Sequence, residues 1–185
     1  MMREDRHDLD GDLLMRAIPL TVTALAAALL LTACNDSGGG KNGKSSSACE
    51  IGGVSVQIGS ASVAPKAGDT GEVPVSITNQ SAPCTLDHFP SASLKTGGAD
   101  VDVPVQQGAK AQKLKLAKGD SATFTISYVR GKEGDKSGLA AKTVKIALPG
   151  SESTRSFPWS YGPVAAKGSS NTPDASVSAF QQVGD

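Results

Sequence analysis

Histidine and methionine are scarce in this 185-residue sequence, and their positions limit the chemistry it can support. There are two histidines and three methionines, and all the methionines lie within the first 15 residues. A zinc site needs three or four ligands at suitable spacing, and after residue 33 only His88 is present to join cysteines. The sequence also has no phosphate-binding loop, haem motif or histidine–methionine copper cluster. We therefore expect no metal site and no cofactor.

A base for hydrolytic catalysis is nearly absent as well. Catalytic triads need a histidine or an equivalent base beside a nucleophile, and no serine here lies in a Gly-x-Ser-x-Gly motif. His88 is more simply interpreted as a turn residue. Asp100 and Asp102 would share one face of a strand whose valines take the core side, so these acids are expected in solvent. We expect no catalytic residues; a secreted hydrolase of unfamiliar type is the less favoured alternative.

Excess charge of one sign is also missing. The chain has 18 basic and 18 acidic residues, and without residues 1–33, which carry three basic and five acidic ones, 15 and 13 remain. Nucleic-acid binding needs a concentrated basic face, so we expect no nucleic-acid partner. The densest basic run alternates along a predicted strand, which is typical of a protected edge strand, with a contact to phosphate or teichoic acid as the alternative. This run consists of Lys110, Lys113, Lys115 and Lys118.

No apolar run is long enough for a typical membrane span. The apolar stretch extends from Ala17 to Leu31, short of the roughly 20 residues that a spanning helix needs, and it fits the core of a signal peptide. It ends in Leu31-Thr32-Ala33-Cys34, a pattern cut by lipoprotein signal peptidases after the cysteine thiol has taken a diacylglyceryl group. We therefore expect residues 1–33 to be a lipoprotein signal peptide and Cys34 to be lipidated. A transmembrane helix that contains a cysteine is the alternative.

The first 14 residues do not fit this signal peptide. They carry five acidic and two basic side chains, whereas the segment before the apolar core is normally positive. A chain starting at Met15 would begin Met-Arg-Ala-Ile-Pro, a short basic segment of the expected kind. We therefore predict Met15 as the true start in place of Met1 or Met2, which leaves His7 outside the protein.

A polar segment separates Cys34 from the rest of the chain. Residues 35–47 are rich in Gly, Ser and Asn and would span about 20 Å root-mean-square as a flexible coil. We assign residues 34–48 to the lipidated cysteine and linker, and residues 49–185 to one domain. Because two or more acyl chains anchor stably, we expect the lipid to hold the domain on the outer face of the cell membrane.

Two cysteines remain in the predicted domain, Cys49 and Cys84. In an exported protein such a pair is typical of a disulfide rather than of a metal site or catalytic thiols. We predict a Cys49–Cys84 disulfide that links the start of the domain to its middle.

The pattern of apolar residues from residue 54 onward has period two, which predicts strands, and no amphipathic helix stands out. Pro74 lies in one of these segments and indicates an edge strand or a bulge. Short antiparallel strands with regular turn signals favour an all-β, immunoglobulin-like sandwich, with a barrel as the alternative. The predicted strands cover residues 54–58, 73–78, 92–94, 101–105, 114–116, 121–129, 144–148 and, less clearly, 177–183.

Aromatic residues are few, and three of them gather at Phe157, Trp159 and Tyr161 in a proline-rich context. The simpler interpretation is that Trp159 caps one end of the core. The alternative is an aromatic platform that binds a sugar or a peptide.

Two further motifs resemble a known family. Asn79 to Leu86, followed by Phe89-Pro90, resembles the asparagine, cysteine-threonine-leucine and aromatic-proline motif of the actinobacterial domain of unknown function 4232. The segment from Leu116 to Ala122 resembles the turn before that family's central strand. The resemblance implies an exported or lipid-anchored immunoglobulin-like sandwich with no assigned activity. Two positions depart from the pattern: Asp87-His88 stands where a glycine is expected, and Lys118 where a proline is usual.

The sequence thus predicts a non-catalytic cell-surface lipoprotein with a binding or envelope-structural role. The membrane, through Cys34, is one expected partner, and a cell-wall glycan or a protein is another. A peptide- or glycan-capturing module that uses Phe157, Trp159 and Tyr161 is the alternative function.

Overall fold

The computed structural model describes residues 47–135, 138–168 and 171–183, all within one compact unit, Asn42–Asp185. The predictions about the signal peptide, the start at Met15, Cys34 and most of the linker lie outside these residues. In the described ranges, no helix has the length and hydropathy that a membrane span requires.

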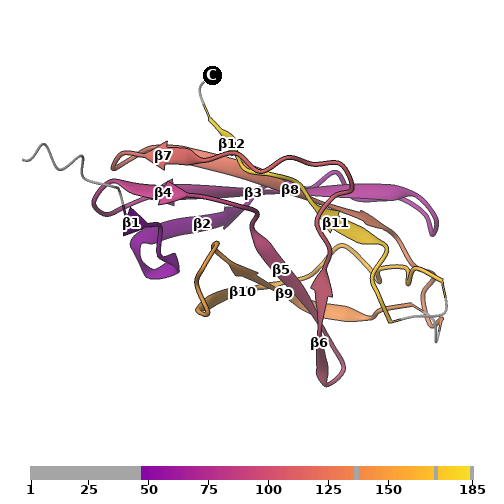
Figure 1. Ribbon diagram of the computed structural model, residues 1–185. Coiled ribbons are helices and arrows are strands. Elements are labelled where there is room, and N and C mark those ends of the chain that lie inside the picture. Colours follow the sequence, from indigo (N-terminus) through magenta and orange to yellow (C-terminus); the bar gives the residue numbers. More distant parts are fainter. Residues whose placement is uncertain (1–46, 136–137, 169–170, 184–185) are drawn as a thin grey trace, which may run out of the picture. The chain divides into compact units, whose positions relative to one another are not determined.

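Two antiparallel sheets carry most of the strands. One has the order β11-β8-β3-β2, with β12 also pairing with β8, and the other has the order β10-β9-β5-β6. Figure 1 shows β3 and β8 side by side, with β5, β9 and β10 in a second layer. The first sheet contains β2 (Val54–Ile58), β3 (Thr70–Asn79), β8 (Ser121–Val129), β11 (Ala175–Val177) and β12 (Gln181–Gln182); the second contains β5 (Ser91–Thr96), β6 (Ala99–Val103), β9 (Ala141–Ala147) and β10 (Thr154–Pro158).

A third, small sheet joins β1 (Ser47–Ala48), β4 (Cys84–Leu86) and β7 (Leu114–Leu116), and a single 3-10 turn, η1 (Ile51–Gly53), precedes β2. The side chains between the sheets form one buried apolar cluster. The order β10-β9-β5 with β6 beside β5 is that of an immunoglobulin-type sheet with one added strand. The predicted all-β antiparallel class is therefore confirmed. The sheets have open edges in the described residues, which is not the arrangement of a closed barrel.

The strand β8 shows why these residues form a sandwich. Its apolar side chains at even positions are buried, while the hydroxyl side chains between them are only partly exposed on the other face. On that outer face the hydroxyl oxygens of Thr78 and Ser121 lie 2.8 Å apart and join β3 to β8. Period-two alternation thus places the core between the sheets and leaves an uncharged hydroxyl surface outside.

The predicted edge position of Pro74 was wrong, because β3 lies between β2 and β8. The Pro74 carbonyl accepts a hydrogen bond of 2.9 Å from Gly59, just beyond the end of β2. Since the N–H and C=O of a strand residue point the same way, the missing N–H of proline faces the place where the β2 ladder stops. The next pair is Ser62 with Glu72, so three steps on one chain oppose two on the other, which fits the bulge alternative.

Val105 was wrongly placed on the core side of its strand. Val103 is buried and Val101 partly so, but Val105 is 44% exposed. The strand β6 ends at Val103, and Pro104 lets the chain leave the sheet, so that Val105 makes an isolated parallel bridge with Val177.

The C-terminal segment was predicted as one strand and forms two short ones, β11 and β12, which both pair with β8. Between them Phe180 is buried and packs edge-on against Phe124, with ring centroids 5.5 Å apart. This aromatic contact anchors the segment where the ladder is interrupted.

The predicted disulfide is confirmed: Cys49 and Cys84 are bonded, with Cα atoms 4.9 Å apart. Next to it, β1 and β4 pair in parallel, with Ala48 opposite Thr85, and the N–H of Cys49 donates to the Thr85 carbonyl at 3.0 Å. The covalent bond and the strand pairing together fasten the beginning of the domain to β4.

Candidate functional site

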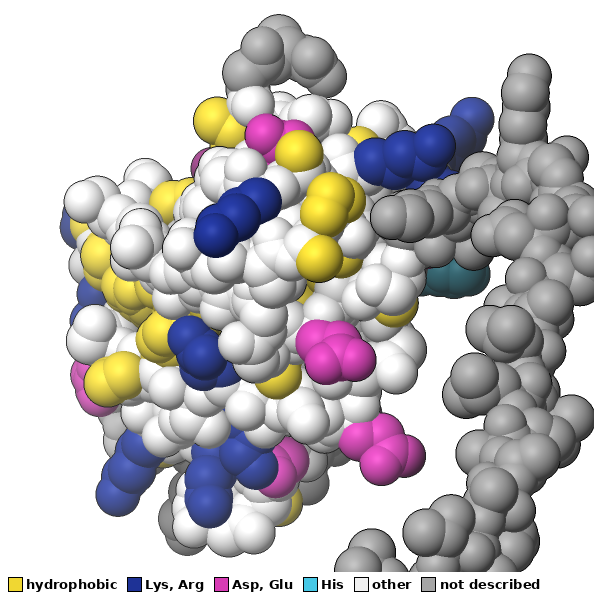
Figure 2. Space-filling model, turned by 90° about the vertical axis from the view of Figure 1, so that its left-hand side faces the viewer, with side chains coloured by type: hydrophobic (Ala, Val, Ile, Leu, Met, Phe, Trp, Pro, Cys, Tyr) yellow, Lys and Arg dark blue, Asp and Glu magenta, His cyan; other side chains and the backbone are white. Residues whose placement is uncertain are grey.

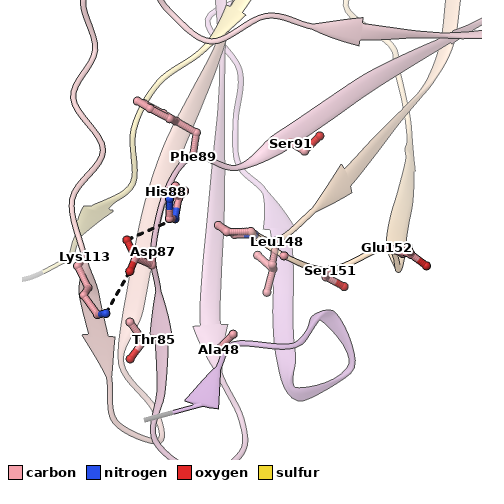
Figure 3. A pocket seen from close by; sticks show the side chains of 12 residues that line it. Ala48, Thr85, Asp87, His88, Phe89, Ser91, Lys113, Leu148, Ser151 and Glu152 are labelled. Atoms are coloured by element: carbon pink, nitrogen blue, oxygen red, sulfur yellow. Dashed lines mark ion pairs between the residues drawn. The ribbon is translucent and has the colours of Figure 1, made fainter. Parts of the chain in front are cut away.

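A hollow of about 840 Å³ lies beside the disulfide and the paired strands β1 and β4. Its walls come from β1, from β4 and the link to β5, from the residue before β7, and from the turn between β9 and β10. Figure 3 shows the side chains that face it. They belong to Ala48, Thr85, Asp87, His88, Phe89, Ser91, Lys113, Leu148, Pro149, Ser151 and Glu152, with Gly150 completing the wall.

Asp87 organises the charges on one wall. Its Oδ2 lies 3.1 Å from Lys113 Nζ, and its Oδ1 lies 3.4 Å from His88 Nδ1 (Figure 3). The hydrogen bond and the positive charge of Lys113 lower the pKa of Asp87 below its ordinary value of 3.8. Both carboxylate oxygens are therefore engaged within the wall, and the charge of Lys113 is largely balanced before any ligand arrives.

His88 has an unusual backbone conformation. Its φ is +80°, and it is the one non-glycine residue with positive φ in the described part of the chain. This region is unfavourable for residues with a Cβ, although histidine tolerates it better than most. The side chain is 82% exposed, so burial of the imidazole does not compensate for the backbone conformation. A glycine would adopt this φ without strain.

The opposite wall is a tight turn after β9. Gly150 has φ of +75°, and the N–H of Ser151 donates to the Leu148 carbonyl at 3.1 Å. Leu148 is buried at the base of the hollow, while Glu152 is exposed at its rim. Figure 3 places Ser91, Ser151 and Glu152 across from the Asp87 wall. The hollow thus has an apolar base between two polar walls.

The aromatic cluster lies elsewhere and is largely part of the core. Trp159 is 6% exposed, and its indole N–H donates to the Gly162 carbonyl at 2.8 Å. Its ring packs edge-on against Tyr128 and Tyr161, at centroid distances of 5.1 and 4.9 Å. Burial raises the pKa of Tyr161, with a contribution from Tyr128. Phe157 is partly buried against the same core. The geometry favours the core-capping interpretation of Trp159, because the face of its ring is not open to a ligand.

Asn79 explains why the asparagine and cysteine-threonine-leucine motif folds as it does. Its side chain is fully buried, and the amide nitrogen donates to the carbonyls of Ala82, Leu116 and Ala117 at 3.0 to 3.2 Å. Its Oδ1 accepts from the N–H and the hydroxyl of Ser81 at 3.0 and 3.1 Å. The side chain therefore ties the end of β3 to the turn before β4 and to the turn before β8. This motif has a structural role.

The remaining candidates from the sequence have ordinary surroundings. β7, which carries Lys115 on its exposed side, is the outer strand of its sheet, as predicted. Asp100 pairs with Lys145 of β9 at 2.5 Å and is exposed, as is Asp102. In residues 47–183, apart from the gaps, no three His, Cys, Asp or Glu side chains are grouped as a metal site would need. Figure 2 shows charges of both signs interspersed on one face.

The hollow was not predicted from the sequence, because its walls come from four separate segments of the chain. One signal was available: the family resemblance led us to expect a glycine where this chain has Asp87-His88. That departure coincides with the positive φ of His88 and with the wall of the hollow.

The model of a family described as "Domain of unknown function (DUF4232)" matches residues 49–181, which begin at the first disulfide cysteine and end in β12. No curated protein matches the chain. The family match covers well over half of the sequence and includes every residue that lines the hollow except Ala48. The chain therefore belongs to the DUF4232 family.

Proposed function

We propose that the protein is a non-catalytic lipoprotein on the outer face of the cell membrane, whose sandwich captures a ligand in the hollow beside Asp87 and His88. The observation that carries the binding role is the hollow itself, which combines an apolar base with polar walls. Clefts of roughly 300 to 1,000 Å³ with a few convergent polar groups are the usual form of small-ligand sites.

The Cys49–Cys84 disulfide supports an extracytoplasmic location, because such bonds persist in oxidising compartments. Lipid attachment at Cys34 is supported by the Leu-Thr-Ala-Cys pattern after an apolar run of signal-peptide length. These two features of the chain agree on the compartment.

The short stretch of sequence between Cys34 and the first residue of the hollow, Ala48, also supports capture close to the membrane. Ala48 lines the hollow and belongs to β1, the first described strand. A flexible linker of residues 35–47 would have a root-mean-square end-to-end distance of about 20 Å. The hollow would therefore meet ligands in the layer directly outside the membrane.

One measurement tests the proposed lipid attachment and location: the intact mass of the protein extracted from its native membrane. The expected mass corresponds to a chain that begins at Cys34, carries acyl groups and lacks two hydrogens at the disulfide. A free or uncleaved chain would contradict the lipoprotein assignment.

Capture is tested on intact cells with a photo-cross-linking residue at Ser151, and with the same residue at Gln57 as the control. Ser151 lines the hollow, whereas Gln57 is exposed on β2. We expect a discrete adduct from position 151 that position 57 does not give. Equal labelling from both positions, or none from 151, would remove the support for a binding role.

A second candidate, a hydrolase, is favoured by one observation: Ser91 lines the same hollow as the Asp87–His88 pair. Among the hydrogen bonds of the described residues, none joins His88 to a serine hydroxyl. Turnover of an ester or peptide substrate that is lost in both His88→Ala and Ser91→Ala would establish this candidate over the binding role.

A further inference from the structure

We propose that the hollow recognises a short, uncharged glycan, and that His88 is its principal specificity-determining residue. This inference rests on the proposed binding function and names its ligand class. It follows from the charges, the hydrogen-bonding groups and the backbone conformation of the two walls.

The charges of the hollow give little attraction to an ion of either sign. Lys113 is already paired with Asp87 at 3.1 Å, so a phosphate or carboxylate ligand would have to compete with that carboxylate. Glu152 is exposed, and a single exposed charge attracts a cation only weakly in salt-containing solution. A ligand without net charge meets neither obstacle.

The polar groups supply donors and acceptors around an apolar base, which is the arrangement a sugar needs. The hydroxyl of Ser91 can donate and accept, and the carboxylate of Glu152 accepts. The Ser151 hydroxyl accepts from the Ser153 N–H at 3.2 Å and donates to the Ser153 carbonyl at 3.5 Å, which leaves it a second lone pair as an acceptor for the ligand. Phe89 and Pro149, which are both partly exposed, give apolar surface that can take the C–H face of a pyranose ring. Sugar hydroxyls act as donors and acceptors at once, so they can bond to both walls.

The conformation of His88 indicates which residue the site depends on. A non-glycine residue with positive φ is retained where its surroundings or its function require it, and the imidazole is exposed in the hollow instead of packed in the core. Asp87 contacts Nδ1 and leaves Nε2 available to a ligand. We assign His88 the central hydrogen bond to the glycan.

The test is calorimetric titration of the mature, full-length protein in detergent micelles with defined probes. The probes are uncharged β-1,4-linked dimers to tetramers of glucose and of N-acetylglucosamine, with a lysine-containing and an aspartate-containing tripeptide as comparisons. We expect saturable binding of at least one oligosaccharide, and loss of about tenfold or more in affinity for His88→Gly, the effect of one good hydrogen bond.

His88→Gly is the informative variant because glycine suits the φ of +80° and leaves the fold intact. Glu152→Gln should weaken binding less, by several-fold, since the amide can still accept a hydrogen bond. Glu72→Gln is the matched control: it makes the same change at an exposed site on β3, outside the hollow, and should leave affinity unchanged.

The outcomes separate the ligand class from the function. Saturable peptide binding that requires His88, without oligosaccharide binding, overturns the glycan inference and keeps the proposed capture role. Oligosaccharide binding that is unaffected by His88→Gly overturns the assignment of His88. Absence of binding by every probe overturns the glycan inference, and if the cross-linker at Ser151 also labels nothing, the proposed function falls with it.

Discussion

The strained backbone at His88 can be measured by comparing glycine and alanine at the same position. Both substitutions remove the imidazole and its exposed 3.4 Å contact with Asp87, so that contact cancels in the comparison. They differ in the Cβ, which at a φ of +80° costs about 1 to 2 kcal/mol, and in the greater freedom of unfolded glycine, which costs about 0.5 to 1 kcal/mol. The net expectation is that His88→Gly is more stable than His88→Ala by about 0.5 to 1 kcal/mol.

Asp102 is the matched control position. It is exposed, and its φ lies outside the positive region, so glycine there should be less stable than alanine by about 0.5 to 1 kcal/mol. The free energy of unfolding is measured by urea denaturation of the mature protein, followed by fluorescence of the buried Trp159. The sign of the glycine–alanine difference should reverse between positions 88 and 102. The same sign at both positions would refute the strain at His88 and the argument built on it.

Three further expectations follow from the structure. Asn79→Ala should lower the free energy of unfolding by about 3 kcal/mol or more, because it leaves backbone groups inside the domain without partners. A loss under about 1 kcal/mol in urea denaturation would contradict the structural role of this side chain. Replacing Cys49 and Cys84 together by serine should lower the free energy of unfolding by about 4 kcal/mol, given the 35-residue separation of the two cysteines. Cross-linking from position 151 should also weaken, because Ala48 in the wall of the hollow is then held by strand pairing alone. Because the pKa of Asp87 is lowered in the folded state, the ionised carboxylate stabilises the fold above the ordinary value of 3.8, and this contribution disappears as the pH falls through the lower, folded value. Asp87→Asn should therefore flatten the acid side of a plot of unfolding free energy against pH. An unchanged plot would count against the ion pair with Lys113.

Most strands of the two main sheets could be predicted because their signal is local. In β8 every second side chain is apolar and buried, and the predicted bounds agree with the structure. The short strands β1, β4 and β10 were not predicted. β4 has all three side chains buried and so lacks alternation, and β10 has mostly exposed ones. β1 and β4 also pair with segments distant in sequence, which a single-sequence pattern does not contain.

The candidate site could be predicted only in part, for a related reason. The aromatic cluster drew attention because Phe157, Trp159 and Tyr161 are close in sequence, yet the fold uses Trp159 to fill the core. The hollow brings together residues as far apart as Ala48 and Glu152, and no local motif connects them. The disulfide was predictable from composition and compartment, but its effect on the hollow, through the pairing of Ala48 with Thr85, required the fold.

Asn79 and His88 have different physical roles in this chain. Asn79 lies in the motif that resembles the family's, and both polar atoms of its side chain are hydrogen-bonded inside the domain. A substitution there therefore lowers the stability of the fold. His88 is exposed in the hollow and is held in a conformation that glycine would adopt more easily. If the imidazole serves recognition, His88→Gly should raise stability while it lowers affinity. A histidine that does not contact the ligand cannot raise stability and lower affinity together when it is replaced. Measuring the free energy of unfolding and the ligand affinity of His88→Gly therefore shows whether His88 is a ligand-binding residue.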